Sequence, residues 1–289
     1  MKTPENPIRR SAAALQSAAP PVLLTVAGFD PSSGAGITAD LAVFAALGGY
    51  GVSCITGLTV QSTTGVAAVE AIPAATVAAT LNCLAADLPV AGMKTGMLAT
   101  AENVLAAGAF CRSHPDIPVV VDPVWRSSSG RALLDAAGEA ALRENLLGRA
   151  GWITPNLAEL AMLTGQTVAG AADVPVAAKR LRQQAAMLGN PALKVVVTGG
   201  HLDRPDDFLL TAEEEAWLPG RRVETSSTHG TGCAFSSALL AGLVLHPGRS
   251  DAEQVQAAKE YVAAALEHAV PMGRGAGPMN LLWPLRTRS

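Results

Sequence analysis

Short apolar runs alternate with helix-forming segments along almost the whole chain, and this alternation restricts the possible folds. Three of the runs, VLLTVA (22–27), PVVVDP (118–123) and LKVVVTGG (193–200), are bounded by glycine, proline or an acid. Runs of this kind predict strands that are buried on both faces of a parallel sheet. Strands that alternate with helices predict one doubly wound α/β domain.

The remaining predicted elements follow the same alternation. Further strands are predicted at residues 50–56 and 90–95 and from residue 152, and helices at 36–47, 73–86, 101–111, 231–245 and 252–269. No internal repeat or linker divides the chain, so residues 21–289 are expected to form a single domain. Residues 1–20 are expected to form a disordered tail, because their apolar stretch is too short and too interrupted for a signal peptide.

Composition and charge exclude several classes of protein. Apolar residues make up 49% of the 289 residues, which is enough for a large core, and the net charge is −3 without a basic patch interleaved with aromatic residues. Nucleic-acid binding is therefore not expected. The absence of any apolar run of about 18 residues predicts no membrane span. The four cysteines are scattered without a C-x-x-C pair, which indicates a reducing cytoplasm and no structural zinc site.

Polar and glycine-rich stretches follow the predicted strands. They lie at residues 28–36, 61–65, 94–97, 122–130, 156–159, 198–201 and 228–233. In a doubly wound sheet the ligand binds at the carboxyl ends of the strands. We therefore expect these stretches to meet in one site.

The segment STHGTGC (227–233) precedes the apolar run AFSSALLAG (234–242), which predicts a buried helix. The start of a helix binds anions through its free N–H groups and its dipole. The same field favours a thiolate, so the pKa of Cys233 is predicted to be lowered. An isolated buried cysteine is ordinarily an inert apolar residue. At this position, a proton acceptor beside an anion site favours phosphoryl transfer to an alcohol.

The loop GFDPSSGAG (28–36) connects the first strand to the first helix. It matches neither the phosphate-binding pattern G-x-x-x-x-G-K-[ST] nor G-x-G-x-x-G, so neither a Walker-type site nor a dinucleotide site is supported. Its glycines indicate a close approach to a small ligand. Asp40, one turn into the helix, is compatible with a surface acid or with a ligand contact.

The segment AGFDPSSGAGITADL (27–41) resembles the opening motif of the hydroxymethylpyrimidine/phosphomethylpyrimidine kinases of thiamine biosynthesis, members of the ribokinase-like superfamily. The segments LTVQST (58–63), KTGML (94–98), VDPV (121–124), TPNLAE (154–159), GGH (199–201) and THGTGC (228–233) follow in the family's order. The resemblance covers the chain from about Leu23 to Met279. It implies a three-layer α/β/α sandwich with a mostly parallel central sheet. It also implies ATP-dependent phosphorylation of 4-amino-5-hydroxymethyl-2-methylpyrimidine and then of its monophosphate.

The resemblance also implies roles for individual residues. Those expected to line the pyrimidine pocket are Gly28, Asp40, Gln61, Met97 and Val124. Those expected near ATP and Mg²⁺ are Asp122, Asn156, Glu159, Thr198 and His229, with Asp122 and Glu159 supporting the metal. Those expected to act in catalysis are Gly230, Thr231, Gly232 and Cys233, with Cys233 accepting the hydroxyl proton. The sequence by itself leaves Asn156 as a helix N-cap, Glu159 as a solvated acid and His229 as a loop residue.

The chain departs from the family pattern at five positions. Phe29 stands where Ser or Thr is usual, Ser33 where Gly is usual, Leu281 where His is common, and Ser128 and Thr198 where lysines are common. The two missing lysines are expected to weaken nucleotide binding or the second phosphorylation, and Arg126 is a candidate replacement charge.

Two other functions remain open at this stage. A pyridoxal or pyridoxine kinase would share the chemistry, since both substrates are methylated nitrogen heterocycles with a hydroxymethyl arm. A non-catalytic pyrimidine-binding regulator would account for the missing lysines, although the retained acids and Cys233 argue against it. A nicotinamide dehydrogenase is disfavoured by the lack of a dinucleotide fingerprint. The family resemblance also implies a homodimer.

Overall fold

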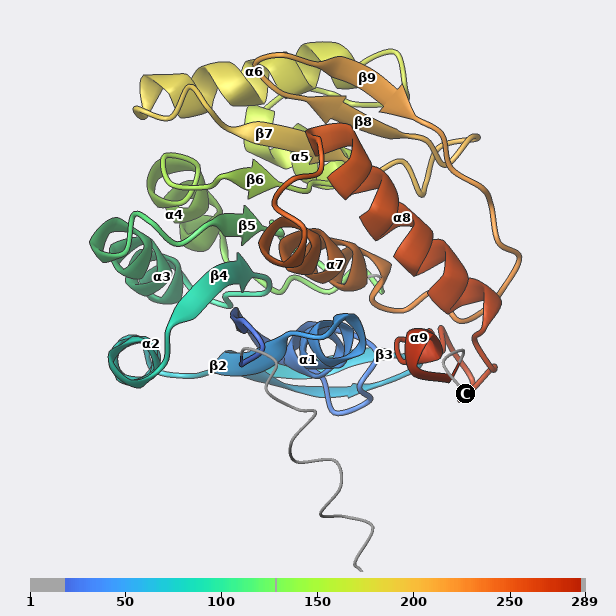
Figure 1. The fold of residues 1–289 in the computed structure, drawn as a ribbon, viewed down its shortest axis with the longest axis horizontal. Helices are drawn as coiled ribbons and strands as arrows, with labels where there is room; N and C mark the ends of the chain where they lie inside the picture. Colours follow the sequence, from blue (N-terminus) through green and yellow to red (C-terminus); the bar gives the residue numbers. More distant parts are fainter. Residues whose placement is uncertain (1–18, 128, 287–289) are drawn as a thin grey trace, which may run out of the picture.

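A nine-stranded sheet forms the centre of the computed structural model, which describes residues 19–127 and 129–286 (Figure 1). Its strands are β1 (Val22–Phe29), β2 (Tyr50–Ser62), β3 (Gly65–Ala71), β4 (Val90–Thr95), β5 (Val119–Val121), β6 (Trp152–Ile153), β7 (Lys194–Val197), β8 (Asp207–Leu210) and β9 (Glu215–Leu218). The order is β3-β2-β1-β4-β5-β6-β7-β8-β9. Six adjacent strands run parallel, namely β2, β1, β4, β5, β6 and β7, and β3, β8 and β9 are antiparallel to their neighbours.

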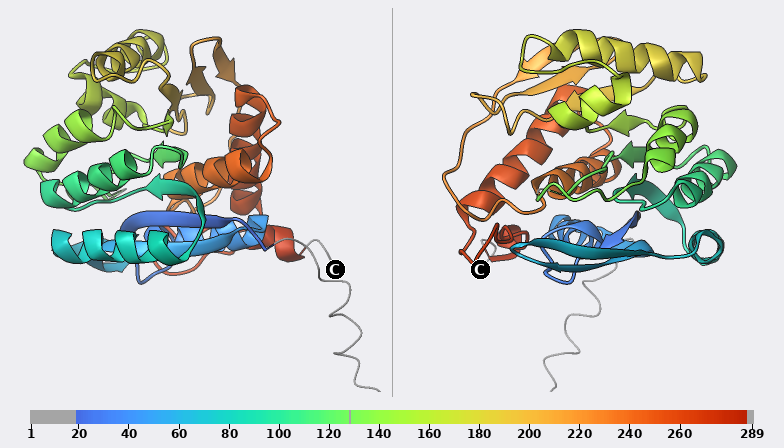
Figure 2. Two further views of the ribbon diagram at one scale, coloured as in Figure 1. Left: turned by 60° about the vertical axis from the view of Figure 1, so that its left-hand side comes forward. Right: turned by 180° about the vertical axis from the view of Figure 1, so that it is seen from behind.

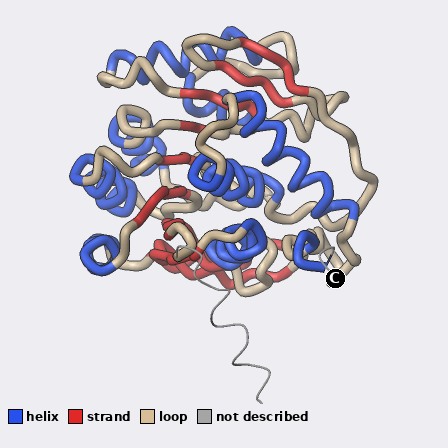
Figure 3. Tube along the Cα trace, viewed as in Figure 1, coloured by secondary structure: helices blue, strands red, loops and turns tan. Residues whose placement is uncertain are grey.

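Helices cover both faces of this sheet (Figures 2 and 3). One face carries α1 (Gly36–Leu47), α7 (Thr231–Leu245), α8 (Asp251–Glu267) and the short α9 (Trp283–Arg286). The other face carries α2 (Ala74–Asp87), α3 (Ala101–Ser113), α4 (Ala136–Asn145), α5 (Leu157–Thr164) and α6 (Val174–Met187). This is the three-layer α/β/α arrangement that the family resemblance implies.

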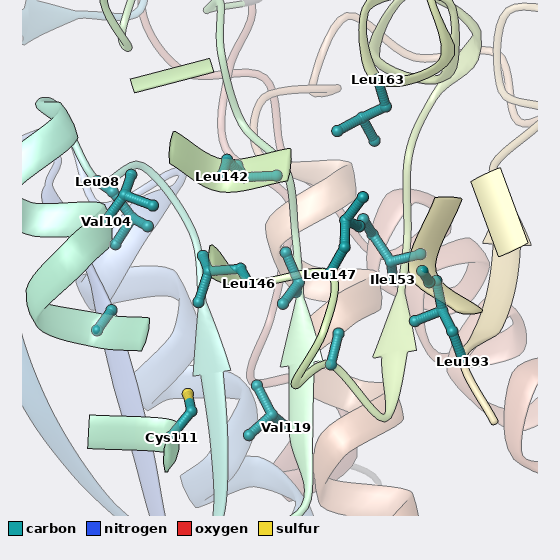
Figure 4. Close-up of a cluster of buried hydrophobic side chains, with 14 of the residues drawn as sticks. Leu98, Val104, Cys111, Val119, Leu142, Leu146, Leu147, Ile153, Leu163 and Leu193 are labelled. Carbon is teal, nitrogen blue, oxygen red and sulfur yellow. The ribbon is translucent and has the colours of Figure 1, made fainter. Parts of the chain in front are cut away.

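Each face of the sheet has its own hydrophobic core, because successive strand residues point to opposite sides. In β1, Leu23 packs with the helices of the α1 side and Leu24 with those of the α2 side. Figure 4 shows part of the second core, in which Leu142, Leu147 and Ile153 meet between sheet and helices. Full burial of each such side chain stabilises the fold by roughly 1.5–3 kcal/mol. The two cores hold the strand ends in fixed register, and those ends carry the polar side chains described below.

The elements predicted from the sequence are present, but several others were missed. β3, β8, β9, α4, α6 and α9 had no prediction. β3 has no buried residue, and β8 and β9 are only four residues long. None of these three strands therefore contains a long apolar run. Of the predicted tail, residues 1–18 lie outside the described residues. None of the described helices has the length and apolar character that a membrane span requires.

Candidate active site

The polar stretches predicted to converge do follow the carboxyl ends of neighbouring parallel strands. Gly28 lies near the end of β1, Met97 after β4, Asp122 directly after β5, Asn156 after β6 and Thr198 directly after β7. Asn156 and Thr198 form a parallel bridge between adjacent strand ends. Gln61 lies near the end of β2, and Cys233 lies in the first turn of α7.

A buried lysine lies at the centre of the site. Lys94 Nζ donates to Asp40 Oδ1 at 2.6 Å and lies 3.7 Å from Asp122 Oδ2. The Lys94 side chain is fully buried. Burial alone would lower the pKa of Lys94, but the carboxylates of Asp40 and Asp122 hold that pKa above its usual value. Lys94 is not among the site residues predicted from the sequence. A lysine inside a buried strand nevertheless indicates a buried acidic partner, because an unpaired buried charge would be very costly.

Asp40 is completely buried, so the surface-acid interpretation is wrong. Its carboxylate accepts hydrogen bonds from Thr25 Oγ1 at 2.6 Å, from Ser237 Oγ at 2.7 Å and from Lys94. These donors come from β1, α7 and β4. In this structure Asp40 therefore joins three elements beneath the site.

Asp122 is the second buried carboxylate of this network. Its Oδ2 accepts a hydrogen bond from Ser236 Oγ at 3.0 Å. Burial raises the pKa of Asp122 above its ordinary value, although Lys94 and Ser236 oppose the rise. A carboxylate with a raised pKa is a better proton acceptor than an ordinary surface acid.

The predicted lowering of the Cys233 pKa is wrong. Burial is the largest effect and raises the pKa of Cys233 to about 12. The charge of Lys94 opposes this rise, whereas the charges of Asp122 and Asp40 add to it. Cys233 as a residue is only half-buried, so water reaches part of it. Cys233 does lie in the first turn of α7, but its burial and the two acids beside it outweigh any effect of the helix start. The resting residue is a thiol.

The start of α7 is nevertheless built to receive an anion. Gly230 is the N-cap, with φ of 81° and no side-chain cap. The first helical bond runs from Ala234 N to Gly230 O at 2.9 Å. The N–H groups of Thr231, Gly232 and Cys233 precede that bond and have no partner within the helix. A Cβ at Gly230 would lie 1.9 Å from Gly34 O, so this position requires glycine.

Asn156 and Glu159 form a reciprocal cap at the start of α5. Asn156 Oδ1 accepts from Glu159 N at 3.0 Å, and Glu159 Oε2 accepts from Asn156 N at 2.8 Å. The N-cap interpretation of Asn156 is thus confirmed. Glu159 is not a solvated acid, because only 6% of it is exposed. Burial, followed by repulsion from Asp122, raises the pKa of Glu159 to about 8.

Asp122 and Glu159 have the donor chemistry that Mg²⁺ prefers. Magnesium in kinases is held by one or two carboxylates together with substrate phosphates and water. No group of three or more His, Cys, Asp or Glu side chains suited to a metal occurs in the described part of the chain. The repulsion between Asp122 and Glu159 is what a bound cation would relieve, so this pair fits a magnesium ion that also contacts ATP.

The raised pKa of Glu159 makes a testable prediction about stability. The folded state keeps this proton up to about pH 8, whereas the unfolded chain releases it near pH 4.5. The stabilisation is therefore fully present below pH 4.5, and it falls by up to about 1.4 kcal/mol per pH unit until pH 8. In Glu159→Gln this fall is expected to disappear. Urea unfolding at pH 5, 6.5 and 8 measures it.

Glu253 provides the matched control for this experiment. It forms the same kind of capping box with Ser250 at the start of α8 but is exposed, and hydrogen bonds from Ser250 lower its pKa. Glu253→Gln should leave the slope between pH 5 and 8 unchanged. Parallel pH profiles for wild type and Glu159→Gln would show that Glu159 ionises below pH 5.

The loop between β1 and α1 is organised by Asp30, another residue to which the sequence analysis gave no role. Asp30 Oδ1 accepts from Ser32 N at 2.8 Å and Ser32 Oγ at 2.7 Å, and Oδ2 accepts from Ala35 N at 2.9 Å. Ser33 has φ of 60°, which explains why glycine is usual at that position. The loop is thereby held in one shape around an ionised carboxylate.

His229 joins this loop to the start of α7 and to β2. Its Nε2 lies 2.8 Å from Asp30 Oδ2 and 2.9 Å from Gln61 Nε2. A Cβ at Gly34 would lie 2.2 Å from His229 Cδ2, so the loop packs directly against the ring. The predicted pyrimidine contact Gln61 and the predicted phosphate contact His229 are therefore neighbours.

Gly28 and Met97 also meet, as the shared-pocket prediction requires. A Cβ on Gly28 would lie 2.4 Å from Met97 Cε. Val124 is half-buried, two residues after Asp122. A hollow of about 220 Å³ borders Gln61 and His229. Its other lining residues are Ser62, Thr63, Thr64, Gly65, Val66, Ser127, Ser129, Gly275 and Ala276.

The missing lysines are not replaced within the described site. Thr198 is half-buried, and Ser128 lies outside the described residues. The guanidinium of Arg126 stacks over the Trp125 ring at 4.6 Å and donates to Gly130 O at 3.2 Å. Arg126 is thus held within its own loop in this structure.

Comparisons with known proteins agree with this geometry. A family model described as phosphomethylpyrimidine kinase matches residues 30–280. The hydroxymethylpyrimidine/phosphomethylpyrimidine kinase of Rhizobium meliloti is 41% identical over 263 residues, which cover 90% of this chain and 96% of that protein. The crystal structure of phosphomethylpyrimidine kinase from Clostridium difficile has a TM-score of 0.71 at 34% identity, covering 85% of this chain and 99% of that one. Pyridoxal kinase from Bacillus subtilis, solved as an ADP complex, has a TM-score of 0.80 at 32% identity, covering 93% and 99%. The ribokinase-like fold predicted from the sequence is confirmed.

Proposed function

The chain belongs to the phosphomethylpyrimidine kinase family and is a kinase, and we propose on this premise that it phosphorylates two pyrimidines. ATP donates its γ-phosphoryl group first to 4-amino-5-hydroxymethyl-2-methylpyrimidine and then to the resulting monophosphate, in thiamine biosynthesis. The observation that carries the proposal is Cys233, which lies in the uncapped first turn of α7 among Asp40, Lys94 and Asp122. That turn offers an anion site beside a group able to exchange a proton.

In the proposed reaction, the hydroxyl oxygen of the substrate forms a bond to the γ-phosphorus as the bond to the β-phosphate oxygen breaks. The N–H groups of the first α7 turn stabilise the transferring phosphoryl oxygens. The hydroxyl proton moves to Cys233. Because the resting residue is a thiol, its own proton passes on to the neighbouring carboxylate of Asp122. Phosphoryl transfer passes through a loose transition state, so positioning and charge stabilisation contribute more than base strength.

Asp122 and Glu159 would hold the Mg²⁺ ion, directly or through water, and Asn156 orients Glu159 through the cap of α5. The ion supplies positive charge against the phosphates. Thr198 lies beside Asn156 at the adjacent strand end, which supports a position near the nucleotide. On the opposite side, Gly28 and Met97 form an apolar wall for the pyrimidine ring.

The test is ATP consumption by the purified protein with Mg²⁺, comparing hydroxymethylpyrimidine, its monophosphate and pyridoxal side by side. Turnover of both pyrimidines is the expected result. Turnover of pyridoxal alone would transfer the protein to the vitamin B6 kinases, a possibility that the structural similarity to a pyridoxal kinase makes specific. Tight pyrimidine binding without turnover would identify a regulatory relative.

The proposal includes a homodimer and a reducing compartment. Leu58 and Val60 on β2 are 43% and 64% exposed, and an apolar surface of this kind on a strand supports pairing with a second copy. Sedimentation velocity would test this, and a monomer at micromolar concentration would contradict it. All four cysteines are free thiols, which supports the cytoplasm as the compartment.

A further inference from the structure

The charge state of Asp30 determines which atom of His229 carries a proton. Burial by itself would raise the pKa of Asp30, but hydrogen bonds from His229 and Ser32 outweigh it and hold the pKa below its usual value. Asp30 is therefore an ionised carboxylate at neutral pH, and such a group only accepts hydrogen bonds. His229 Nε2 lies 2.8 Å from Asp30 Oδ2. This nitrogen must therefore carry a hydrogen and donate it.

The same nitrogen faces the side-chain amide of Gln61 at 2.9 Å. A ring nitrogen that carries a hydrogen has no lone pair to accept from an amide N–H. The amide oxygen of Gln61 must therefore face it, sharing the hydrogen that goes to Asp30, and the amide nitrogen must point away. As the side chain stands, Nε2 faces His229, and Oε1 lies 3.1 Å from Thr59 Oγ1. Rotation by 180° about the last side-chain bond places the oxygen where the nitrogen was and the nitrogen where the oxygen was. The hydrogen-bond network decides between the two orientations.

The contacts at the other end of the Gln61 amide independently require the same orientation. The Thr59 hydroxyl has one hydrogen, and it lies 3.0 Å from Phe29 O, a carbonyl that can only accept. With that hydrogen used, Thr59 Oγ1 is left as an acceptor for Gln61. The atom 3.1 Å away is then the amide nitrogen. His229 and Thr59 therefore require the same orientation.

We propose that His229 and Thr59 fix the Gln61 amide with its oxygen toward the start of α7 and its nitrogen toward β2, and that this orientation sets which way round the aminopyrimidine binds. The second part rests on the proposed function. An amide oxygen accepts two hydrogen bonds and an amide nitrogen donates two, so one of each remains for a ligand. The acceptor lies on the His229 side and the donor on the Thr59 side.

A 4-aminopyrimidine presents an amine donor directly beside a ring-nitrogen acceptor. It can satisfy both free positions of Gln61 only with its amine on the His229 side. A pyridoxal ring has no amine beside its nitrogen, so it leaves either the free acceptor or the free donor of the Gln61 amide without a hydrogen bond. His229 is thus a positioning residue that contributes to the choice of the pyrimidine over pyridoxal, and it acts through Gln61.

The orientation is tested without any substrate, by nuclear Overhauser effects in protein with ¹⁵N-labelled glutamine side chains. The Gln61 amide protons are expected to show cross-peaks to Thr59 side-chain protons. Cross-peaks to the ring protons of His229 in their place would overturn the proposed orientation. This result is independent of whether the protein phosphorylates pyrimidines.

The consequence for binding is tested with His229→Leu and His229→Gln, in which only the glutamine keeps a donor near the original Nε2. His229→Leu is expected to raise the KM for the pyrimidine about tenfold, the effect of losing roughly one net hydrogen bond, while kcat changes less than about threefold. His229→Gln is expected to restore most of the loss. Thr59→Val should also raise this KM, without touching α7.

A different result would overturn the role of His229 through Gln61. If His229→Leu lowers kcat or raises the KM for ATP, and His229→Gln does not restore the wild-type value, His229 acts on phosphate. The variants are compared only if their urea midpoints match the wild-type value, and Thr59→Val retains the test if His229→Leu does not fold. No turnover in the wild type, with the expected cross-peaks present, would contradict the proposed function alone.

Discussion

Replacement of Cys233 by alanine is expected to lower kcat by ~10²–10⁴-fold, with the affinity for the pyrimidine nearly unchanged. The thiol lies at the start of α7, so alanine keeps the uncapped N–H groups and the apolar wall of Gly28 and Met97 but removes the group that exchanges the proton. Steady-state kinetics together with calorimetric titration of the pyrimidine separate the two effects.

Cys233→Ser distinguishes two roles for the thiol. With a pKa of about 12, Cys233 is a thiol at neutral pH, and the proposed mechanism uses it to pass a proton to Asp122. A serine hydroxyl can pass on a proton in the same way, so this variant should recover part of the activity. If Cys233 acted as a free thiolate, serine would be as inactive as alanine.

Cys83→Ala is the matched control, because Cys83 is an exposed free cysteine on α2. It should retain wild-type kinetics. Unchanged turnover in Cys233→Ala would refute the assigned catalytic role, and a loss shared by both alanine variants would point to a general effect of removing a cysteine.

The relation between sequence and structure differs among the residues of this site. Gln61, Met97, Asp122 and Asn156 follow strands of one parallel sheet, and such positions converge whatever the details of packing. Their convergence could therefore be predicted. The antiparallel strands β3, β8 and β9 could not, because they are short or exposed and carry no long apolar run.

The pKa of Cys233 shows where local reasoning stops. The helix start that favours a thiolate is visible in the sequence, since it depends only on neighbouring residues. The burial of Cys233 and the approach of Asp40 and Asp122 depend on the packing of α1 and β5 against α7. These long-range contacts reverse the direction of the shift. Lys94 was overlooked for the same reason, because its partner Asp40 lies 54 positions away in the chain.

Replacement of Lys94 by methionine is expected to destabilise the fold by about 3–5 kcal/mol and to abolish most of the activity. Methionine fills a similar volume but leaves Asp40 buried with only the hydroxyl groups of Thr25 and Ser237 as donors. A buried carboxylate without a cation either retains an uncompensated charge or takes up a proton. Urea unfolding at pH 7 measures the loss of stability.

Two further variants test whether the loss of stability in Lys94→Met comes from the buried charge of Asp40. Asp40→Asn in the Lys94→Met background removes that charge and keeps an acceptor for one of the two hydroxyl donors, Thr25 or Ser237. It should therefore recover at least about 1 kcal/mol, as expected for coupled partners. Lys179→Met breaks an ion pair with Glu215 whose side chains are 52% and 43% exposed, and it should cost less than about 1 kcal/mol. A Lys94→Met protein as stable as Lys179→Met would show that Asp40 needs no counter-ion. The buried network beneath Cys233 would then be held together by its hydroxyl donors alone.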